Sequence, residues 1–175
     1  LEVLRQIIPR VRRVHIFYDL NDRFSRDNFA LTKKSAEKIG LEVVEHGTKS
    51  AEELRASLGN LQSGANDVLF QIPDNLVSSE ADFIFKTARR KRLATMFNEE
   101  VWAIKGALAA YGPSNYQMGR QAAGLIDKIL KGEKPENLPV EPARKFDLII
   151  NFRTATAIGL TIPPDMLKKA DKIIR

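Results

Sequence analysis

Polar side chains that could hold a small charged molecule gather in two short segments of the 175-residue chain. The first segment offers Asn21, Asp22 and Ser25, and the second offers Asp74 and Asn75. A carboxylate can hold an ammonium group, whereas a hydroxyl and the free backbone amides at the start of a helix can hold a carboxylate. Together these residue types favour a site for a small zwitterion.

Aromatic residues near both segments could form the apolar walls of such a site. They are Phe17, Tyr18, Phe24 and Phe97. A purely structural alternative stays open for the second segment, because Asp and Asn are common in turns and as helix N-caps. In that case Asp74 and Asn75 would simply end one element and begin the next.

Three carboxylates suggest a second kind of site, a phospho-acceptor pocket that holds magnesium. Asp19 and Asp22 follow the first expected strand, and Asp74 follows the third. A pocket of this kind needs a lysine after the fifth strand to meet the phosphoryl group. That stretch reads Tyr-Gly-Pro-Ser at 111–114, and Lys105 lies at the other end of the strand. The motif is therefore incomplete, and it stands as an alternative only.

Residues for catalysis or metal binding are scarce. The chain has no cysteine and only two histidines, which excludes disulfide scaffolds, thiol catalysis and zinc sites of the cysteine type. We expect His15 inside a strand as a structural residue, and His46 in a solvated turn. No phosphate-binding glycine motif and no set of nucleophile, base and orienting residue is present. We therefore expect a binding protein rather than an enzyme, with no metal and no cofactor.

The net charge of the chain is positive, with 28 Lys and Arg against 22 Asp and Glu, which gives +6. The basic residues are spread over separate expected elements and lack interleaved aromatics, so we expect no nucleic-acid partner. Hydrophobic residues make up 43% of the chain and charged residues 29%, which suits one folded domain. No stretch approaches the roughly 18 uncharged apolar residues that a membrane-spanning helix requires.

Strands alternate with helices along the chain. We expect strands over 14–18, 41–45, 67–72, 93–97, 107–111 and 146–151. We expect helices over 25–39, 50–64, 77–92 and 115–130, shorter ones over 99–104 and 154–158, and a last helix from about 161. This order predicts an α/β fold, an open parallel sheet with helices on both faces. In such sheets ligands bind beyond the carboxyl ends of the strands, commonly between the first and third, which places both polar segments at one edge.

The second half of the sequence resembles a known family. The residues that carry the resemblance are 111–116, 119–123, 129–135, 138–141 and 151–164. They are similar to those of the substrate-binding proteins of ABC transporters, and more narrowly to the type I periplasmic-binding-protein branch associated with tryptophan, tyrosine and related ligands. The match extends over essentially the whole chain, and the run from Ala109 to Pro164 is its specific part.

The resemblance implies a protein of two α/β lobes that close on a small ligand, of which this chain is the second lobe plus a returning segment. The implied division is a second-lobe domain over 1–112, a returning helix and crossover connector over 113–143, and a C-terminal strand with helices over 144–175. The first lobe would precede Leu1. The helical spacing of Leu4 and Ile7 at the very start of the chain agrees with a chain entered within a helix.

The resemblance also implies a function and a site. The function is that of a non-enzymatic component of an ABC importer, in the periplasm or anchored outside the cell, which delivers an amino-acid-like ligand to a membrane permease. A ligand-sensing domain of a regulator is the alternative, because the two-lobed fold serves there as well. Ser25, Asp74 and Asn75 correspond best to ligand contacts, followed by Asn21, Asp22, Phe97 and Tyr111. Phe24 stands where the branch often has Asn, which replaces a polar group by an apolar wall.

Overall fold

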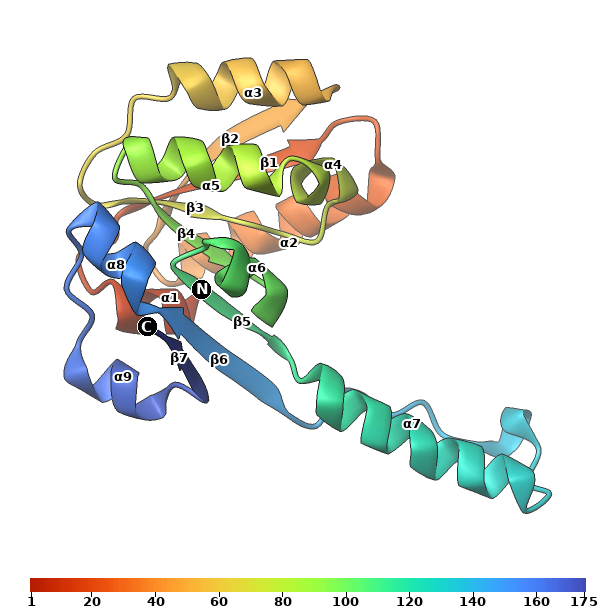
Figure 1. Cartoon of the computed structure of the whole chain (residues 1–175). Helices are drawn as coiled ribbons and strands as arrows, with labels where there is room; N and C mark the ends of the chain where they lie inside the picture. Colours follow the sequence, from red (N-terminus) through yellow and green to blue (C-terminus); the bar gives the residue numbers. More distant parts are fainter.

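A seven-stranded sheet forms the centre of the computed structural model, which describes residues 1–175. The strand order is β2-β1-β3-β4-β5-β6-β7, and every neighbouring pair is parallel except β5 and β6. The α/β fold with a largely parallel sheet was predicted from the alternation of elements, and the structure confirms it (Figure 1). The strands are β1 (Arg13–Asp19), β2 (Glu42–Thr48), β3 (Asp67–Phe70), β4 (Ala94–Phe97), β5 (Ala109–Pro113), β6 (Phe146–Asn151) and β7 (Lys172–Ile174).

Helices cover both faces of this sheet (Figure 1). One face packs against α1 and α2, and the other against α3, α4, α5 and α6. None of the helices is both long enough and apolar enough to cross a membrane. Their bounds are α1 (Glu2–Ile7), α2 (Arg23–Lys38), α3 (Ala51–Asn60), α4 (Asn75–Ser79), α5 (Ala81–Arg90), α6 (Glu100–Lys105), α7 (Asn115–Leu130), α8 (Phe152–Ile158) and α9 (Pro164–Lys169), with a 3-10 turn at Pro135–Asn137.

Strand β1 shows how the sequence builds the two faces. Its side chains alternate between the two faces of the sheet. Val14 and Ile16 belong to the larger apolar cluster, on the face covered by α1 and α2, and Phe17 belongs to the cluster on the face covered by α3 and α5. All three are at most 1% exposed. Burial on both faces is what a central parallel strand requires, and it explains the continuous apolar run of the sequence here.

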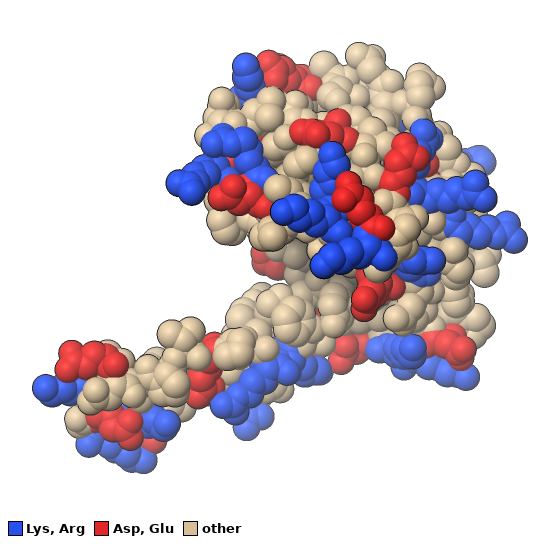
Figure 2. Space-filling view, turned by 180° about the vertical axis from the view of Figure 1, so that it is seen from behind, with Lys and Arg blue, Asp and Glu red and all other residues tan.

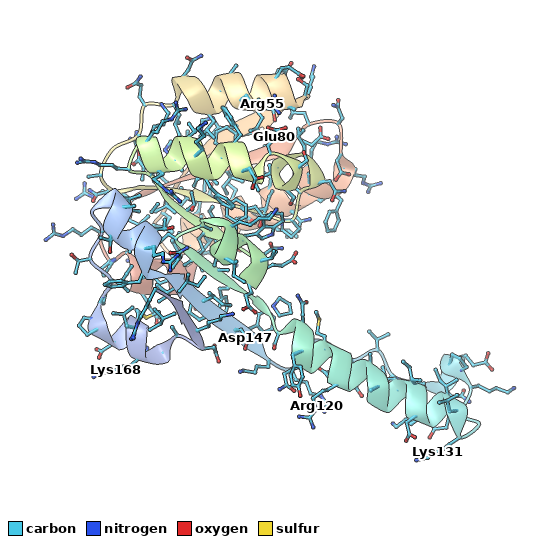
Figure 3. All side chains as sticks on the ribbon, viewed as in Figure 1. Arg55, Glu80, Arg120, Lys131, Asp147 and Lys168 are labelled. Atoms are coloured by element: carbon cyan, nitrogen blue, oxygen red, sulfur yellow. The ribbon has the colours of Figure 1, made fainter.

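Four of the helices, α2, α3, α4 and α8, begin after a residue whose side chain caps them. The hydroxyl of Ser50 accepts a hydrogen bond from the amide of Glu53 at 3.2 Å and begins α3, while the carboxylate of Glu53 accepts from the amide of Lys49. The single helix predicted over 77–92 is wrong. Asp74 caps a short α4 that ends at Ser79, and Glu80 separates it from α5. Glu80 is held there by Arg55 of α3, whose guanidinium donates to both carboxylate oxygens at 2.6 and 2.9 Å (Figure 3).

The last two strands differ from a uniformly parallel sheet. After β5, the chain leaves through α7 and returns at the same edge of the sheet, so β6 has to run antiparallel to β5, with Ala110 opposite Ile149. Strand β7 was not predicted at all. Its three residues pair with β6, and Asp171 just before them accepts a hydrogen bond from the amide of Leu148 at 2.8 Å.

Helix α7 and the connector after it form an arm that projects from the body of the domain, which Figure 1 shows plainly. No residue of α7 is buried. Gln121 joins the connector to the helix, because its side chain donates to Glu141 and to the carbonyl of Pro142 and accepts from the amide of Arg144. The arm is thus a unit of its own that shares little of the core.

Basic and acidic groups are mixed over the body of the domain. Figure 2 shows Lys and Arg side chains beside Asp and Glu over most of the visible face, rather than one continuous basic surface. Arg13, for instance, is paired with Asp67, and Lys172 with Glu100. The first of these pairs has a buried carboxylate and the second is exposed, and in both the basic group is matched by an acidic one.

Candidate functional site

Asp74 lies where the two predicted polar segments meet. Its side chain is 6% exposed, and its two carboxylate oxygens accept hydrogen bonds from two different segments. The amide of Val77 donates to Oδ1 at 2.8 Å, and the amide of Asp19 donates to Oδ2 at 2.7 Å. Asp74 is therefore the N-cap of α4, as the structural alternative held, and it also fastens the end of β1 to the loop after β3.

The first segment is ordered by Asp22 in the same way. The carboxylate of Asp22 accepts from the amides of Phe24 and Ser25 and from the Ser25 hydroxyl at 2.9 Å. The hydrogen bonds from Ser25 and then from Phe24 lower the pKa of Asp22 below its ordinary value. Ser25 itself is fully buried, so its hydroxyl serves the helix cap. Asn21 is exposed, and its side chain donates to the carbonyl of Lys49 at 3.0 Å.

The other three predicted site residues lie in different surroundings. Asn75 is exposed in the first turn of α4, next to Asp74. Phe97 is 2% exposed, with its ring centre 4.9 Å from that of Phe85, so it supports the edge from inside the core. Tyr111 is 40% exposed and stacks on Phe146. The structure therefore brings Asn21, Asp22, Ser25, Asp74 and Asn75 to one edge, places Phe97 beneath it, and sets Tyr111 near the start of the arm.

Three polar side chains at the same edge were missed in the sequence. Gln71 follows β3, Asn98 follows β4, and Trp102 lies in α6. Gln71 Oε1, Asn98 Oδ1 and Trp102 Nε1 are shielded from solvent and have no hydrogen-bond partner within the chain. Each unpaired buried polar atom carries a desolvation cost, which a polar group that reached it would relieve. For Gln71 and Asn98 the available indication was their position directly after a strand, the same one that singled out Asn21 and Asp22. Trp102 lies within a short helix, where a packing role was the default expectation.

The ends of β4 and β5 approach unusually closely beside this edge. A Cβ atom added to Gly112 would lie 1.7 Å from the backbone carbonyl oxygen of Asn98. Only glycine leaves room for that carbonyl. Gly112 therefore fixes how the fourth and fifth strands end, and with them where Asn98 and the start of α7 lie.

The two histidines meet in the structure, contrary to the prediction for one of them. His15 lies within β1 and is 2% exposed, as expected for a structural residue. The prediction that His46 lies in a solvated turn is wrong, because β2 extends to Thr48 and includes it. His15 Nδ1 and His46 Nε2 are 2.9 Å apart. Burial, and then the neighbouring His15, lowers the pKa of His46 to about 4.

The carboxylates of the phospho-acceptor alternative are already in use. Asp19 accepts a hydrogen bond from the amide of Asn21 at 2.8 Å, Asp22 caps α2, and Asp74 accepts from two amides. No group of three or more His, Cys, Asp or Glu side chains is placed to hold a metal ion. The geometry is that of carboxylates that order backbone segments.

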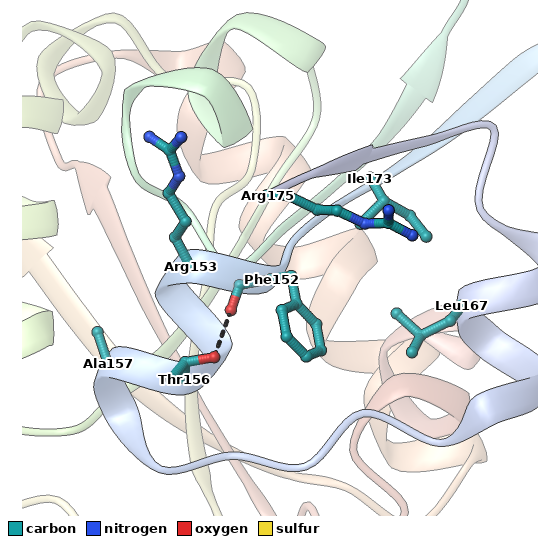
Figure 4. Close-up of a pocket in the computed structure, with 7 residues that line it drawn as sticks. All are labelled: Phe152, Arg153, Thr156, Ala157, Leu167, Ile173 and Arg175. Atoms are coloured by element: carbon teal, nitrogen blue, oxygen red, sulfur yellow. Dashed lines mark hydrogen bonds between the residues drawn. The ribbon is translucent and has the colours of Figure 1, made fainter.

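A separate hollow lies beside the edge strand β7 (Figure 4). It has a volume of about 780 Å³. The hydroxyl of Thr156 is bonded to the carbonyl of Phe152, and the head group of Arg153 points away from Leu167. The hollow is therefore an open apolar surface without converging polar groups, unlike the edge that holds Asp74. Its lining residues are Phe152, Arg153, Thr156, Ala157, Leu167, Ile173 and Arg175.

A family model described as "ABC transporter substrate binding protein" matches residues 1–174. The chain belongs to this family. The resemblance found in the sequence is thus confirmed at the level of the family, and so is the periplasmic-binding-like fold of a lobe. What the family's model describes is a substrate-binding protein, so at the level of the family the expected role is binding.

Individual proteins with similar sequences or structures are consistent with membership of this family. A tyrosine-binding protein of Clostridioides difficile is 27% identical over 160 residues, which cover 91% of this chain and 46% of that protein. A conserved domain protein from Vibrio cholerae has a similar structure, with a TM-score of 0.82 and 27% identity. A Streptococcus pneumoniae ABC domain in complex with L-Trp, 24% identical, shares the fold with a TM-score of 0.83.

The chain spans only part of these relatives. It covers 46% of the tyrosine-binding protein, while the two solved structures are covered to 58% and themselves cover 98% and 99% of this chain. The whole proteins therefore contain a large portion with no counterpart among residues 1–175.

Proposed function

We propose that this chain is the second lobe of a two-lobed binding protein that holds a small amino acid, with an aromatic side chain, at the carboxyl edge of β1, β3 and β4. The observation that carries the proposal is the position of Asp74, which lies at this edge with Asn21, Asp22 and Asn75 around it. The tyrosine-binding relative supports the ligand class. In this proposal the protein binds the amino acid outside the cytoplasm, in the periplasm or at the cell surface, and delivers it to a permease in the membrane.

The chemistry of the edge suits an amino acid. Asp74 can attract an ammonium group, because its charge is only partly offset by the two amides that donate to it. The unpaired atoms of Gln71 and Asn98 are acceptors, and that of Trp102 is a donor. Phe24, 62% exposed at the start of α2, supplies an apolar surface next to Asp22. Ser25 and Phe97 act in this scheme by ordering the loop and supporting the edge from within.

The arm supports the existence of a second lobe. The side of α7 that faces the connector is polar and includes Arg120, Gln121 and Lys128. The opposite side is an exposed apolar stripe, consisting of Met118, Ala122, Ala123, Ile126, Ile129 and Leu130. Helix α7 leaves the edge at which β5 ends, so a first lobe that completes the ligand cleft at this edge would lie near the arm, and the stripe would give that lobe an apolar face to cover. The division into 1–112, 113–143 and 144–175 is part of this proposal.

Asp74→Asn tests the site. The amide keeps an oxygen for the N-cap of α4 and removes the charge that would hold the ligand's ammonium group, but its NH2 group can no longer accept from the amide of Asp19. Circular dichroism and the urea midpoint of the variant show whether the loop keeps its fold without that contact. We expect the affinity for L-tyrosine or L-tryptophan, measured by calorimetry on a longer protein that contains both lobes, to fall about 10- to 150-fold, which is the loss of a charge-assisted hydrogen bond.

A matched control is Asp165→Asn on α9, whose carboxylate is 86% exposed and lies 3.9 Å from Lys168. It should leave the affinity unchanged. Equal affinity of the Asp74→Asn variant and the wild type would remove Asp74 from the site. Absence of binding of both amino acids to the wild type would refute the proposed ligand class.

The apolar stripe gives a separate prediction for the 175-residue chain on its own. Without a partner for α7, the chain should bind a hydrophobic dye and self-associate in light scattering. The double variant Ile126→Lys and Ile129→Lys should lose most of both effects while its circular dichroism stays the same. The two isoleucines are 54% and 39% exposed, so their replacement leaves the core intact. A monomeric wild-type chain that binds no dye would contradict the idea of a face made for a first lobe.

A further inference from the structure

A chain of hydrogen bonds runs from α3 across the neighbouring strands β2, β1 and β3, away from the proposed ligand edge. It begins at Ser57 in α3, whose hydroxyl lies 3.4 Å from His46 Nδ1 in β2. His46 Nε2 is 2.9 Å from His15 Nδ1 in β1, and His15 Nε2 is 3.2 Å from Asp67 Oδ2 in β3. The chain ends at Arg13, which binds both oxygens of Asp67 at 2.9 and 2.6 Å. One series of contacts thus joins a helix to three neighbouring strands.

The direction of this chain is determined by its acidic end. Asp67 accepts hydrogen bonds from Arg13 and from the amide of Gly64, and its carboxylate can only accept from His15 as well. His15 Nε2 therefore carries a proton, and in a neutral ring Nδ1 is then an acceptor. It follows that His46 donates from Nε2 and that Ser57 donates to His46 Nδ1. Every donor in the neutral chain points toward Asp67.

We propose that Ser57, His46, His15 and Asp67 act as a pH-sensitive lock, which takes up one proton by reversing the direction of its hydrogen bonds and opens when a second proton arrives. The first proton enters at His46 Nδ1, while the proton on His46 Nε2 passes to His15 Nδ1. His15 is then an imidazolium beside the carboxylate of Asp67, and the Ser57 hydroxyl accepts from His46. All contacts of the chain are kept.

A second proton has no such arrangement. It would have to reside on His46 Nε2, which faces the protonated Nδ1 of His15 at 2.9 Å. Two donors and two positive charges would then oppose each other in a partly buried place. The lowered pKa of His46, about 4, agrees with this resistance to protonation. The repulsion between the two protonated rings is relieved only when β2 and α3 move away from β1.

Other charged groups near the two rings are engaged elsewhere. On α3, Glu53 accepts from the amide of Lys49, and Arg55 is paired with Glu80. On β2, Glu45 accepts from the hydroxyl of Tyr18 on the opposite face of the sheet. The remaining contact of His46 is the ring of Phe17, stacked with its centre 4.3 Å away. Asp67 is thus the charged group that the histidine pair contacts, and Arg13 is paired with Asp67.

The lock is connected to the first polar segment through β2. The amide of Leu20 donates to the carbonyl of Thr48 at 2.8 Å, and the side chain of Asn21 donates to the carbonyl of Lys49 at 3.0 Å. Detachment of β2 would remove both contacts and loosen the loop around Asp22. Acidification would therefore act on this loop from within the domain, whatever ligand the edge binds.

Nitrogen-15 spectra of the two imidazole rings, recorded on the 175-residue chain between pH 8 and pH 4, test the lock because they distinguish the tautomers. At the start we expect both rings to carry their proton on Nε2. During the first titration step His15 should become doubly protonated while His46 changes to the Nδ1 tautomer. Retention of the Nε2 proton by His46 through this step would overturn the proposal.

Two further measurements address each step separately. Ser57→Ala removes the acceptor that the reversed chain needs, so the first step should move to lower pH by about half a unit; an unchanged step would contradict the reversal. Hydrogen exchange should show that amides of β2 lose protection on further acidification before those of β4 do. Simultaneous loss in both strands, or full protection of β2 with both rings doubly protonated, would refute the opening.

The contribution to stability has a definite sign. Because the pKa of His46 is lowered in the folded state from 6.5 to about 4, the unfolded chain takes up a proton in this range that the folded chain does not. Stability should therefore be full above pH 6.5 and decline as the pH falls toward 4. His46→Gln should make the urea midpoint less dependent on pH in that window. An equally steep decline in the variant would assign the acid sensitivity to other groups and contradict the lock.

Discussion

Replacement of Gly112 by alanine should destabilise the domain by about 3 kcal/mol or more, the upper range for overpacking a buried position. The reason is geometric, because the new Cβ would lie 1.7 Å from the carbonyl oxygen of Asn98. That oxygen belongs to the backbone, so no flexible side chain can move to make room. The measurement is urea denaturation followed by circular dichroism, with the wild-type chain beside it.

Gly59→Ala is the matched control for this substitution. Gly59 lies in α3, and nothing would lie within 4 Å of a Cβ added there. The change should be neutral or stabilise by up to about 1 kcal/mol, since alanine favours a helix over glycine. A Gly112→Ala variant as stable as Gly59→Ala would show that β4 and β5 can separate freely, and that their ends do not fix the position of Asn98.

Most of the fold could be predicted because hydrophobic periodicity and caps are local properties. The start of the helix predicted from Ser50 depends on a hydrogen bond between Ser50 and Glu53, three residues apart, and the structure has it. The helix predicted from Ser25 begins two residues earlier, because Asp22 caps it. The alternation of strands and helices predicted the parallel sheet for the same reason. The split of α4 from α5 could not be foreseen, because it involves Arg55, which is 25 residues from Glu80 in the sequence.

Features that depend on pairing between distant segments were beyond local patterns. His46 was assigned to a turn because Gly47 follows it, yet the register of β2 against β1 brings it opposite Phe17 and beside His15. Strand β7 has three residues, too few for a pattern of alternation, and exists because β6 offers it a partner. In the candidate site, the loops were found from the position of strand ends, but the contact of Asp74 with the amide of Asp19 depends on tertiary structure.

Asp67→Ala should cost about 3 kcal/mol of stability, toward the lower end for a broken buried ion pair, because the side chain of Arg13 is 39% exposed. The side chain of Asp67 is itself 3% exposed and accepts hydrogen bonds from Arg13, His15 and Gly64. Its removal leaves all three donors without a partner at the start of β3. Urea denaturation at pH 7 measures the loss.

The pH dependence of the same variant separates the charge of Asp67 from the volume of its side chain. Burial alone would raise the pKa of Asp67, but the hydrogen bonds from Arg13, Gly64 and His15 outweigh it and hold the pKa below 3.8. The carboxylate therefore stabilises the fold above that pH, and its contribution is lost as the pH falls through the lowered pKa. The stability of Asp67→Ala should accordingly decline less than that of the wild type below pH 4.

Asp165→Ala, which removes a carboxylate that is 86% exposed and 3.9 Å from Lys168, should change stability by less than about 0.5 kcal/mol and follow the wild-type profile. If both variants behaved alike, the ion pair of Asp67 with Arg13 would contribute no more than an exposed pair, and the hydrogen-bond chain through His15 would lack the acidic end that gives it a direction.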